Sequence, residues 1–251
     1  MLLAELKWPE VDALSRDVPV ILPIAAHEQH GHHLPLHTDS LLLGEVVRRL
    51  ESSMGDRLLF APLQWLGNSH HHLGFPGTLS SEPRAYLDLL LSEAECLLQH
   101  GFRRLVFLNG HGGNQVPGAQ AVFELRQQHR RQKDLLLLST TYWEHGSLKE
   151  EGLGFSQSRM GHACEWETSM MLVVRPDLVG AYREQESVSQ QEPTAPAARG
   201  WTMGDRSERG HIGDPAAATP EKGERLLETF TQGLGPFFER LGLAAGDPPS
   251  P

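Results

Sequence analysis

The sequence is poor in cysteine and has no long apolar run. Its 251 residues include two cysteines, Cys96 and Cys164, too few for a disulfide framework and consistent with a reducing cytosol. Every apolar stretch is interrupted after a handful of residues, far short of the roughly 20 residues that span a bilayer. The first residues carry acids and lack a basic region followed by an apolar run, so no signal peptide is expected. These features predict a cytoplasmic protein.

Basic residues are scarce relative to acidic ones. The chain has 22 Lys and Arg against 32 Asp and Glu, a formal net charge of −10 at pH 7. A nucleic-acid binder needs a basic stripe that releases phosphate counterions, so we expect neither a nucleic acid nor a membrane as partner. The 39% hydrophobic content suffices for a sizeable core. We expect one domain over 1–251, with a disordered tail at about 244–251.

Short apolar runs alternate with helical patterns along the chain. Residues 18–25 are continuously apolar, as expected for a strand buried on both faces. Further strands are predicted over 58–64, 104–109 and 134–143. Helices are predicted over 38–53, 80–101, 116–131, from 167 to a stop before Pro176, and from 219 onward, with a surface loop at 184–200. This order predicts an α/β fold with helices on both faces of a parallel sheet.

Histidine is the residue in excess, with 14 copies, and the copies gather in loops. Residues 25–40, AAHEQHGHHLPLHTDS, follow the first predicted strand, and parallel sheets bind ligands at this end of a strand. Glu28, His30 and Asp39 are potential metal ligands of mixed oxygen and nitrogen type, able to hold one cation or two. The alternative is a polar loop of solvated histidines. The other histidines of this loop are His27, His32, His33 and His37.

A glycine-rich turn, NGHGGN, follows the third predicted strand at residues 109–114. Its glycines allow a sharp turn and a close approach to a ligand. His111 would then stand at the strand end, beside the first cluster if the two strands are neighbours. A phosphate-binding loop is the competing interpretation, but the sequence has neither the Walker lysine nor the G-x-G-x-x-G spacing.

A third cluster, GHACEWETS, spans residues 161–169 at a loop-to-helix junction. It adds one imidazole, His162, and two carboxylates, Glu165 and Glu167. The two carboxylates would point apart on a helix, so at most one is expected to bind a metal. Cys164 fits a small buried residue better than a ligand of a soft metal.

A triple histidine at residues 70–72 lies within the fourth feature, GNSHHHLGFPGT. It predicts either a substrate-facing loop or a surface tract, and the sequence favours neither. Three further histidines stand alone and are expected to be structural or solvated. They are His100, His129 and His145.

These motifs together resemble the creatininase (creatinine amidohydrolase) family. EQHGHHLPLHTD, residues 28–39, is similar to the family signature EQHG-x-HLP-x-x-TD. The NGHGGN turn, the FPGT of residues 75–78, the HACEWETS segment and the GDPAAAT of residues 213–219 follow the family pattern in order. The resemblance covers roughly residues 5–240, and several ordered motifs are far more specific than any one alone.

The resemblance implies a three-layer α/β/α sandwich with a central, mostly parallel sheet, and commonly a hexamer. It also implies a dinuclear metal centre that hydrolyses a C–N amide-type bond through a metal-bound hydroxide. By motif position, Glu28 and His30 look like ligands of different metals. Asp39 looks like the bridging carboxylate, and His111 like a further ligand. The ligand types suit two divalent ions of Zn, Mn or Fe.

Two positions depart from creatininase itself. Gly113 stands where creatininase has a metal-binding Glu, and we infer Glu165 as the replacement, with Glu167 as the fallback. Gly161 stands where creatininase has a catalytic Glu, next to His162, which matches a proton-shuttling histidine. Both departures weigh against creatinine as the substrate. We expect His162, helped by whichever glutamate does not bind metal, to protonate the leaving nitrogen.

The expected function is metal-dependent hydrolysis of a small cyclic amide or formamide. Relatives that share NGHGGN suggest one alternative, a formylaminopyrimidine nucleotide deformylase, and the family resemblance suggests another, a peptidase of a modified peptide. A silent metal-binding assembly protein is the alternative from a different class. The retained ligand set weighs against it, because a degenerate site would usually have lost Asp39 or His111.

Overall fold

The computed structural model describes residues 1–146, 148, 153–191, 194 and 196–243. Within these residues, four parallel strands form one sheet in the order β2-β1-β3-β4. The strands are β1 (Val20–Ile24), β2 (Leu59–Phe60), β3 (Arg104–Asn109) and β4 (Leu136–Thr141). The predicted α/β fold with a parallel sheet is confirmed.

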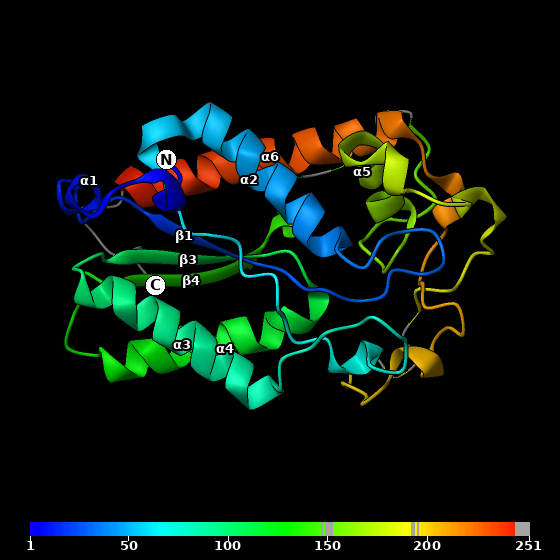
Figure 1. Ribbon diagram of the computed structural model, residues 1–251, viewed down its shortest axis with the longest axis horizontal. Coiled ribbons are helices and arrows are strands. Elements are labelled where there is room, and N and C mark those ends of the chain that lie inside the picture. The colour runs from blue at the N-terminus through cyan, green and yellow to red at the C-terminus, as the bar shows by residue number, and fades with distance from the viewer. Residues whose placement is uncertain (147, 149–152, 192–193, 195, 244–251) are drawn as a thin grey trace.

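Helices cover both faces of this sheet. They are α1 (Trp8–Asp12), α2 (Thr38–Met54), α3 (Pro83–Gln99), α4 (Gln115–Gln128), α5 (Glu165–Val174) and α6 (Pro220–Leu243). Figure 1 shows α2, α5 and α6 on one side of the strands and α3 and α4 on the other. The result is the expected three-layer α/β/α sandwich.

The strands divide their side chains between two hydrophobic cores. Val20 and Leu22 pack with residues of α3, whereas Ile21 packs with residues of α2, α5 and α6. In β3, Phe107 belongs to the core that contains Val20 and Leu22, and Val106 belongs to the core that contains Ile21. A strand buried on both faces needs an apolar side chain at every position. This explains why the strand segments are continuously apolar in the sequence.

β2 is shorter than predicted, with Leu59–Phe60 in place of 58–64. Pro62 has no N–H to donate to a ladder, so regular pairing ends before it. Gln64 returns to the sheet through a single bridge to Ile24.

α5 begins at Glu165, two residues earlier than predicted, and ends before Pro176 as expected. The predicted tail at 244–251 lies outside the described residues, as does part of the predicted loop at 184–200. No helix in the described part of the chain is both long and apolar enough to cross a membrane.

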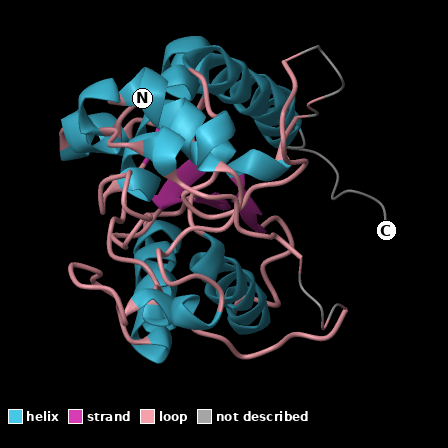
Figure 2. Ribbon diagram, turned by 90° about the vertical axis from the view of Figure 1, so that its right-hand side faces the viewer, coloured by secondary structure: helices cyan, strands magenta, loops and turns pink. Residues whose placement is uncertain are grey.

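The carboxyl ends of β1 and β3 lie side by side, because Ile24 pairs with Asn109. The loop 25–37 and the turn 110–114 therefore meet at one edge of the sheet. Figure 2 looks onto this end of the molecule, where loops cover the strands. The fold thus brings the first two histidine clusters together.

Candidate metal centre

Buried carboxylates from three segments converge at this edge of the sheet. Glu28 comes from the loop after β1, Asp39 from the first turn of α2 and Glu167 from the first turn of α5. Each of the three residues is at most 5% exposed. The N-terminal end of a helix favours negative charge, which lowers the cost of placing Asp39 and Glu167 there.

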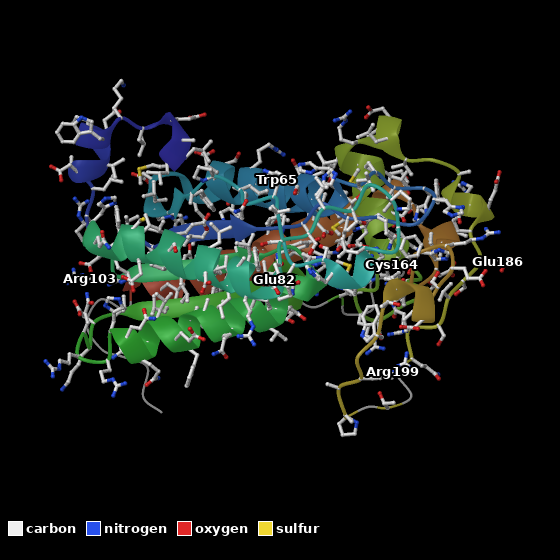
Figure 3. The ribbon with its side chains drawn as sticks, turned by 60° about the horizontal axis from the view of Figure 1, so that its bottom comes forward. Trp65, Glu82, Arg103, Cys164, Glu186 and Arg199 are labelled. Atoms are coloured by element: carbon white, nitrogen blue, oxygen red, sulfur yellow. The ribbon has the colours of Figure 1, made fainter. Side chains whose placement is uncertain are left out.

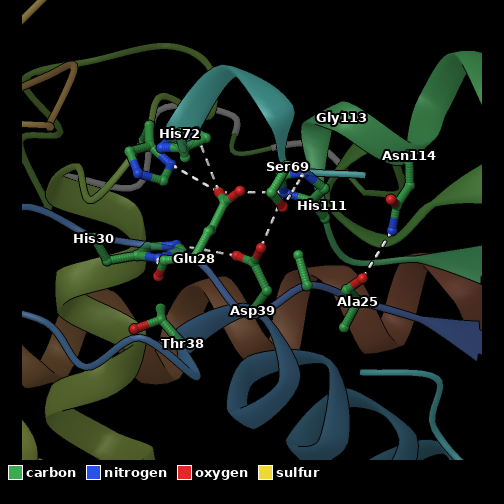
Figure 4. Close-up of polar contacts among 12 residues, drawn as sticks. Ala25, Glu28, His30, Thr38, Asp39, Ser69, His72, His111, Gly113 and Asn114 are labelled. Atoms are coloured by element: carbon green, nitrogen blue, oxygen red, sulfur yellow. Dashed lines mark hydrogen bonds and ion pairs between the residues drawn. The ribbon is translucent and has the colours of Figure 1, made fainter. Parts of the chain in front are cut away.

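Histidines stand between these carboxylates. His30 Nε2 lies 3.0 Å from Asp39 Oδ1 and 3.7 Å from Glu167 Oε1. His111 Nδ1 lies 3.0 Å from Asp39 Oδ2 and 3.3 Å from Glu28 Oε1. Asp39 therefore faces one histidine with each oxygen and lies at the centre of the cluster (Figure 4).

Several carboxylate oxygens lack a hydrogen-bond donor. Neither oxygen of Glu28, nor Oε2 of Glu167, accepts a hydrogen bond within the described residues. Burying such groups is costly unless a cation compensates them. Ligand atoms of Glu28, His30 and Asp39 lie within 4.8 Å of one another, as do those of His30, His162 and Glu167. Converging oxygen and imidazole donors of this kind fit divalent metal ions.

Protons on the histidines compensate the negative charge of the metal-free cluster. Burial disfavours the charged form of His111, but Glu28 and Asp39 outweigh burial and raise its pKa to about 10. His30 is also buried, yet Asp39 and Glu167 raise its pKa well above the ordinary value. The two histidines in turn hold the pKa of Asp39 below its usual range despite burial. In the metal-free protein, protonated His30 and His111 therefore supply the positive charge that metal cations would supply in the loaded protein.

We expect the metal-free protein to lose stability as the pH rises from about 6.5 to about 10. His111 holds its proton more tightly in the folded chain than in the unfolded one. Its contribution is therefore complete below pH 6.5 and lost once the pH passes about 10. The loss is on the order of a few kcal/mol in the free energy of unfolding. Thermal unfolding of chelator-treated protein across this range measures it.

A metal-loaded sample is the control for this pH dependence. Metal ligation requires neutral imidazole, so the loaded protein has already given up the proton of His111. Its melting temperature should not follow the decline. Equal declines in the loaded and stripped samples would contradict the assignment of the proton to His111.

His162 lies against this cluster. Its ring centroid is 4.3 Å from those of His30 and His72, and its Nδ1 lies 3.5 Å from Glu28 Oε1. Its Nε2 donates to the carbonyl oxygen of Gln29 at 2.8 Å, which leaves Nδ1 without a proton. Burial, with the nearby charge of His30, holds the pKa of His162 well below its ordinary value. The ring is therefore neutral, with a proton acceptor facing Glu28.

Glu165 does not lie in the cluster. Its Oε1 pairs with Lys222 Nζ at 2.5 Å, and its Oε2 accepts hydrogen bonds from the backbone N–H and hydroxyl of Ser156, each at 2.8 Å. Glu167 points the other way, toward His30. The structure therefore does not bring Glu165 to the cluster where we expected it. Lys222 already compensates its charge, and Glu167 takes the place beside His30.

Close backbone contacts explain the glycines at 113 and 161. A Cβ at Gly113 would lie 2.2 Å from the carbonyl oxygen of Asn68. A Cβ at Gly161 would lie 2.2 Å from the carbonyl oxygen of Ile212. No side chain fits at these distances unless the backbone moves. This backbone therefore leaves no room for a glutamate at either position, where the resemblance to creatininase would place one.

His71 and His72 also reach the site, a point on which the sequence alone was undecided. Both lie in the short 3-10 helix His70–His72. His72 is buried, and its Nε2 lies 3.4 Å from Glu28 Oε1. His71 stacks on His111 with a centroid distance of 5.8 Å. The triple histidine therefore belongs to a loop that faces the cavity.

The other histidines of the first loop mostly serve the loop itself. His27 and His37 share a hydrogen bond of 3.2 Å between their Nδ1 atoms. His33 Nε2 lies 3.0 Å from both the carbonyl oxygen of Ala163 and the hydroxyl of Thr168. This loop is therefore fixed by its own side chains, which positions Glu28 and His30.

The cluster forms the floor of a cavity of about 620 Å³. Trp143 and Trp201 contribute to its lining, as do three arginines. The arginines are Arg159, Arg199 and Arg206. Arg199 comes from a peripheral loop (Figure 3). The only acids among the described lining residues are the three buried carboxylates. Negative charge thus gathers at the floor, and positive charge gathers nearer the solvent.

Comparison with known proteins agrees with this geometry. The family model described as creatinine amidohydrolase matches residues 4–238. The chain is 33% identical over 231 residues to a mycofactocin precursor peptide peptidase of Mycolicibacterium smegmatis, a match that covers 89% of this chain and 85% of that protein. It is 32% identical over 250 residues to a creatinine amidohydrolase of Pseudomonas putida, with coverages of 92% and 93%.

Solved structures show the same likeness. A mutant creatininase complexed with creatine superposes with a TM-score of 0.82 at 28% identity, covering 95% of this chain and 97% of that one. A manganese form of creatininase matches with a TM-score of 0.81 at 28% identity and the same coverages. The family model, the relatives and the folds thus agree over nearly the whole chain. The chain belongs to the creatininase family.

Proposed function

We propose that this protein is a metal-dependent amidohydrolase that hydrolyses the C–N bond of a small cyclic amide or formamide. The observation that carries the proposal is the convergence of three buried carboxylates and two histidines at the floor of an open cavity. Both oxygens of Glu28 and Oε2 of Glu167 accept no hydrogen bond within the described residues, so they are available to a cation. A silent assembly protein would have no need to retain them beside a cavity.

The residues divide into two ligand sets that share Asp39. Glu28 and His111 would hold one cation, and His30 and Glu167 the other. Asp39 lies 3.0 Å from a nitrogen of each histidine, which supports a bridging role. Glu167, which we expected to assist proton transfer, is thus assigned to the metal. Oxygen and imidazole ligands suit Zn, Mn or Fe, and the solved creatininases include a Zn-Zn type and a manganese form.

Divalent cations held by these residues would lower the pKa of a bound water molecule and polarise the amide carbonyl. His162 acts as the general base and then as the general acid. Its unprotonated Nδ1 accepts the proton released by the attacking water and then donates it to the leaving nitrogen. The bond from Nε2 to the carbonyl oxygen of Gln29 fixes the ring in the tautomer that this transfer needs.

A substrate panel tests this proposal. Creatinine, cyclic ureides, formamides and short peptides are assayed with Mn²⁺, Zn²⁺ and Fe²⁺. We expect hydrolysis of at least one amide class and little turnover of creatinine, because Gly113 and Gly161 replace creatininase glutamates. Robust creatinine turnover would show that these two replacements do not matter. No hydrolysis of any member would contradict the proposed function.

A specific observation favours substrates that carry an anionic group. Arg159, Arg199 and Arg206 line the cavity, and its only described acids lie at the floor, where cations would neutralise them. Arginine binds carboxylate and phosphate groups through paired hydrogen bonds. The substrates of the deformylase and peptidase alternatives both carry an anionic group that these arginines could bind. A formylaminopyrimidine nucleotide carries phosphate, and a peptide carries a terminal carboxylate, as would suit a relative of the mycofactocin precursor peptide peptidases.

We expect Arg159→Gln to raise the KM for an anionic amide about tenfold, the effect of roughly 1.4 kcal/mol of lost binding. The kcat for a neutral formamide should not change. Arg84→Gln, in the first turn of α3, is the matched control. Steady-state kinetics with phosphate-bearing and carboxylate-bearing amides distinguishes the two anions. An unchanged KM for both would rule out this role for Arg159.

The hexamer implied by the family resemblance is part of the proposal. Light scattering of the purified protein measures the assembly directly. We expect a hexamer. An active monomer would contradict the proposed assembly and leave the proposed reaction intact.

A further inference from the structure

His71 lies beside the metal cluster, and hydrogen bonds do not fix its ring within the described residues. No hydrogen bond within the described part of the chain uses either of its ring nitrogens, whereas both neighbours are engaged. His70 Nδ1 lies 2.8 Å from the hydroxyl of Ser80, and His72 Nδ1 lies 2.6 Å from the side-chain nitrogen of Gln29. The middle imidazole of the triplet is thus the one left with two free nitrogens.

Aromatic neighbours nevertheless hold the ring of His71 in one place. It stacks on His111 at an interplanar angle of 17°, and it meets Trp201 edge-on at a centroid distance of 5.1 Å. His72 packs against it at 4.2 Å. Gly113 makes room for the ring, because a Cβ at that position would lie 3.0 Å from His71 Cε1. An imidazole that is held this firmly without hydrogen bonds is ready to bind a ligand.

The free nitrogens of His71 lie next to the metal cluster. Ligand atoms of Glu28, His71 and His111 all lie within 4.8 Å of one another. Ligand atoms about 2.0–2.1 Å from one cation can be at most about 4.2 Å apart, so a small rotation of the side chains closes the set.

We propose that His71 is an additional metal ligand, which joins Glu28, His111 and Asp39 around the cation on that side of the bridge. This inference rests on the proposed function, because it assumes that the cluster binds metal. The His71 side is then richer in nitrogen than the other side, where His30 and Glu167 share Asp39. Imidazole-rich sites favour Zn, Fe, Co and Ni over Mn. The two sites should therefore differ in affinity and in metal preference, with the more open coordination on the His30 side.

Metal titration of His71→Ala tests the assignment. Untagged, chelator-stripped protein is titrated with Zn²⁺ or Co²⁺ by calorimetry, and metal content is measured after dialysis. We expect one of the binding events to weaken by at least about 10–100-fold. The visible absorption of bound Co²⁺ should change with the loss of a nitrogen ligand. His70→Ala is the matched control, because His70 bonds Ser80 instead, and it should bind metal like the unaltered chain.

His71→Asp is a second variant, which tests the assignment if the alanine variant folds poorly. A carboxylate at this position should restore binding while altering the Co²⁺ spectrum. Metal binding by His71→Ala equal to that of the unaltered chain would overturn the assignment and leave the proposed function intact. An unaltered chain that binds no divalent cation would instead overturn the proposed function itself.

Discussion

Replacing Asp39 with alanine is expected to remove most of both metal ions and to lower amide hydrolysis by about 10³-fold or more. Asp39 is the residue that faces both histidines, at 3.0 Å from His30 Nε2 and 3.0 Å from His111 Nδ1. Its loss therefore weakens both ligand sets at once. Metal analysis of untagged protein, with kinetics on the best substrate of the panel, measures both effects.

Asp39→Asn is the matched variant, because it keeps the shape of the side chain and removes its charge. It should lose metal as the alanine variant does while retaining the fold, as judged by circular dichroism. Glu45→Gln, farther along α2 where Glu45 pairs with Arg48 and Arg49 and not with the cluster, should keep both metals. A tightly bound ion that survives in both Asp39 variants would refute the bridging role.

Lys222→Met is expected to destabilise the protein by about 3–5 kcal/mol, because it leaves the charge of Glu165 buried without a compensating positive charge. Glu165 is fully buried, and Lys222 joins α6 to α5 through this pair. A loss of this size corresponds to a fall in melting temperature of roughly 10 °C. Chemical denaturation of the single variant and of Glu165→Gln/Lys222→Met measures it, and the double variant should recover much of the loss.

The same variants separate the two glutamates of α5. Glu165→Gln should retain its full metal content, since Glu165 bonds Lys222 and Ser156. Glu167→Gln should lose the ion on the His30 side. The opposite pattern, with metal lost from Glu165→Gln and kept in Glu167→Gln, would restore the assignment that the sequence suggested.

The fold and the centre of the site could be predicted because local patterns determine them. Continuous apolar runs indicated the buried strands, and the turn after β3 indicated a ligand-binding strand end. The neighbouring strand ends at Ile24 and Asn109 then bring Glu28, His30 and His111 together. The pairing of two parallel strands aligns their ends. An error of a few residues in the predicted strand bounds therefore does not change which loops meet at the edge of the sheet.

The choice between Glu165 and Glu167 could not be predicted, because it depends on a distant partner. The periodicity of α5 shows that the two side chains point apart, but it does not show which faces the cavity. Lys222, 57 residues away, pairs with Glu165 and so holds this side chain away from the cluster. The sequence around Lys222 has no feature that indicates this contact.

The role of the triple histidine could not be predicted for a related reason. The loop 67–78 lacks periodicity, and its position depends on contacts with other loops. The backbone N–H of Asn68 donates a hydrogen bond to Asn114 Oδ1, and the backbone N–H of Ser69 donates one to the hydroxyl oxygen of Ser80. These contacts turn His71 and His72 toward Glu28. Residue type alone left the loop indistinguishable from an exposed tract.

Hydrolysis of the best amide substrate during metal reconstitution tests the proposed chemistry most directly. Chelator-stripped, untagged protein is titrated with Zn²⁺ or Mn²⁺, and the rate is followed at each step. We predict no hydrolysis by the stripped protein and a rate that levels off near about two equivalents of metal per chain. Equal rates in the stripped and reconstituted protein, or no hydrolysis at any metal content, would contradict a metal-dependent amidohydrolase.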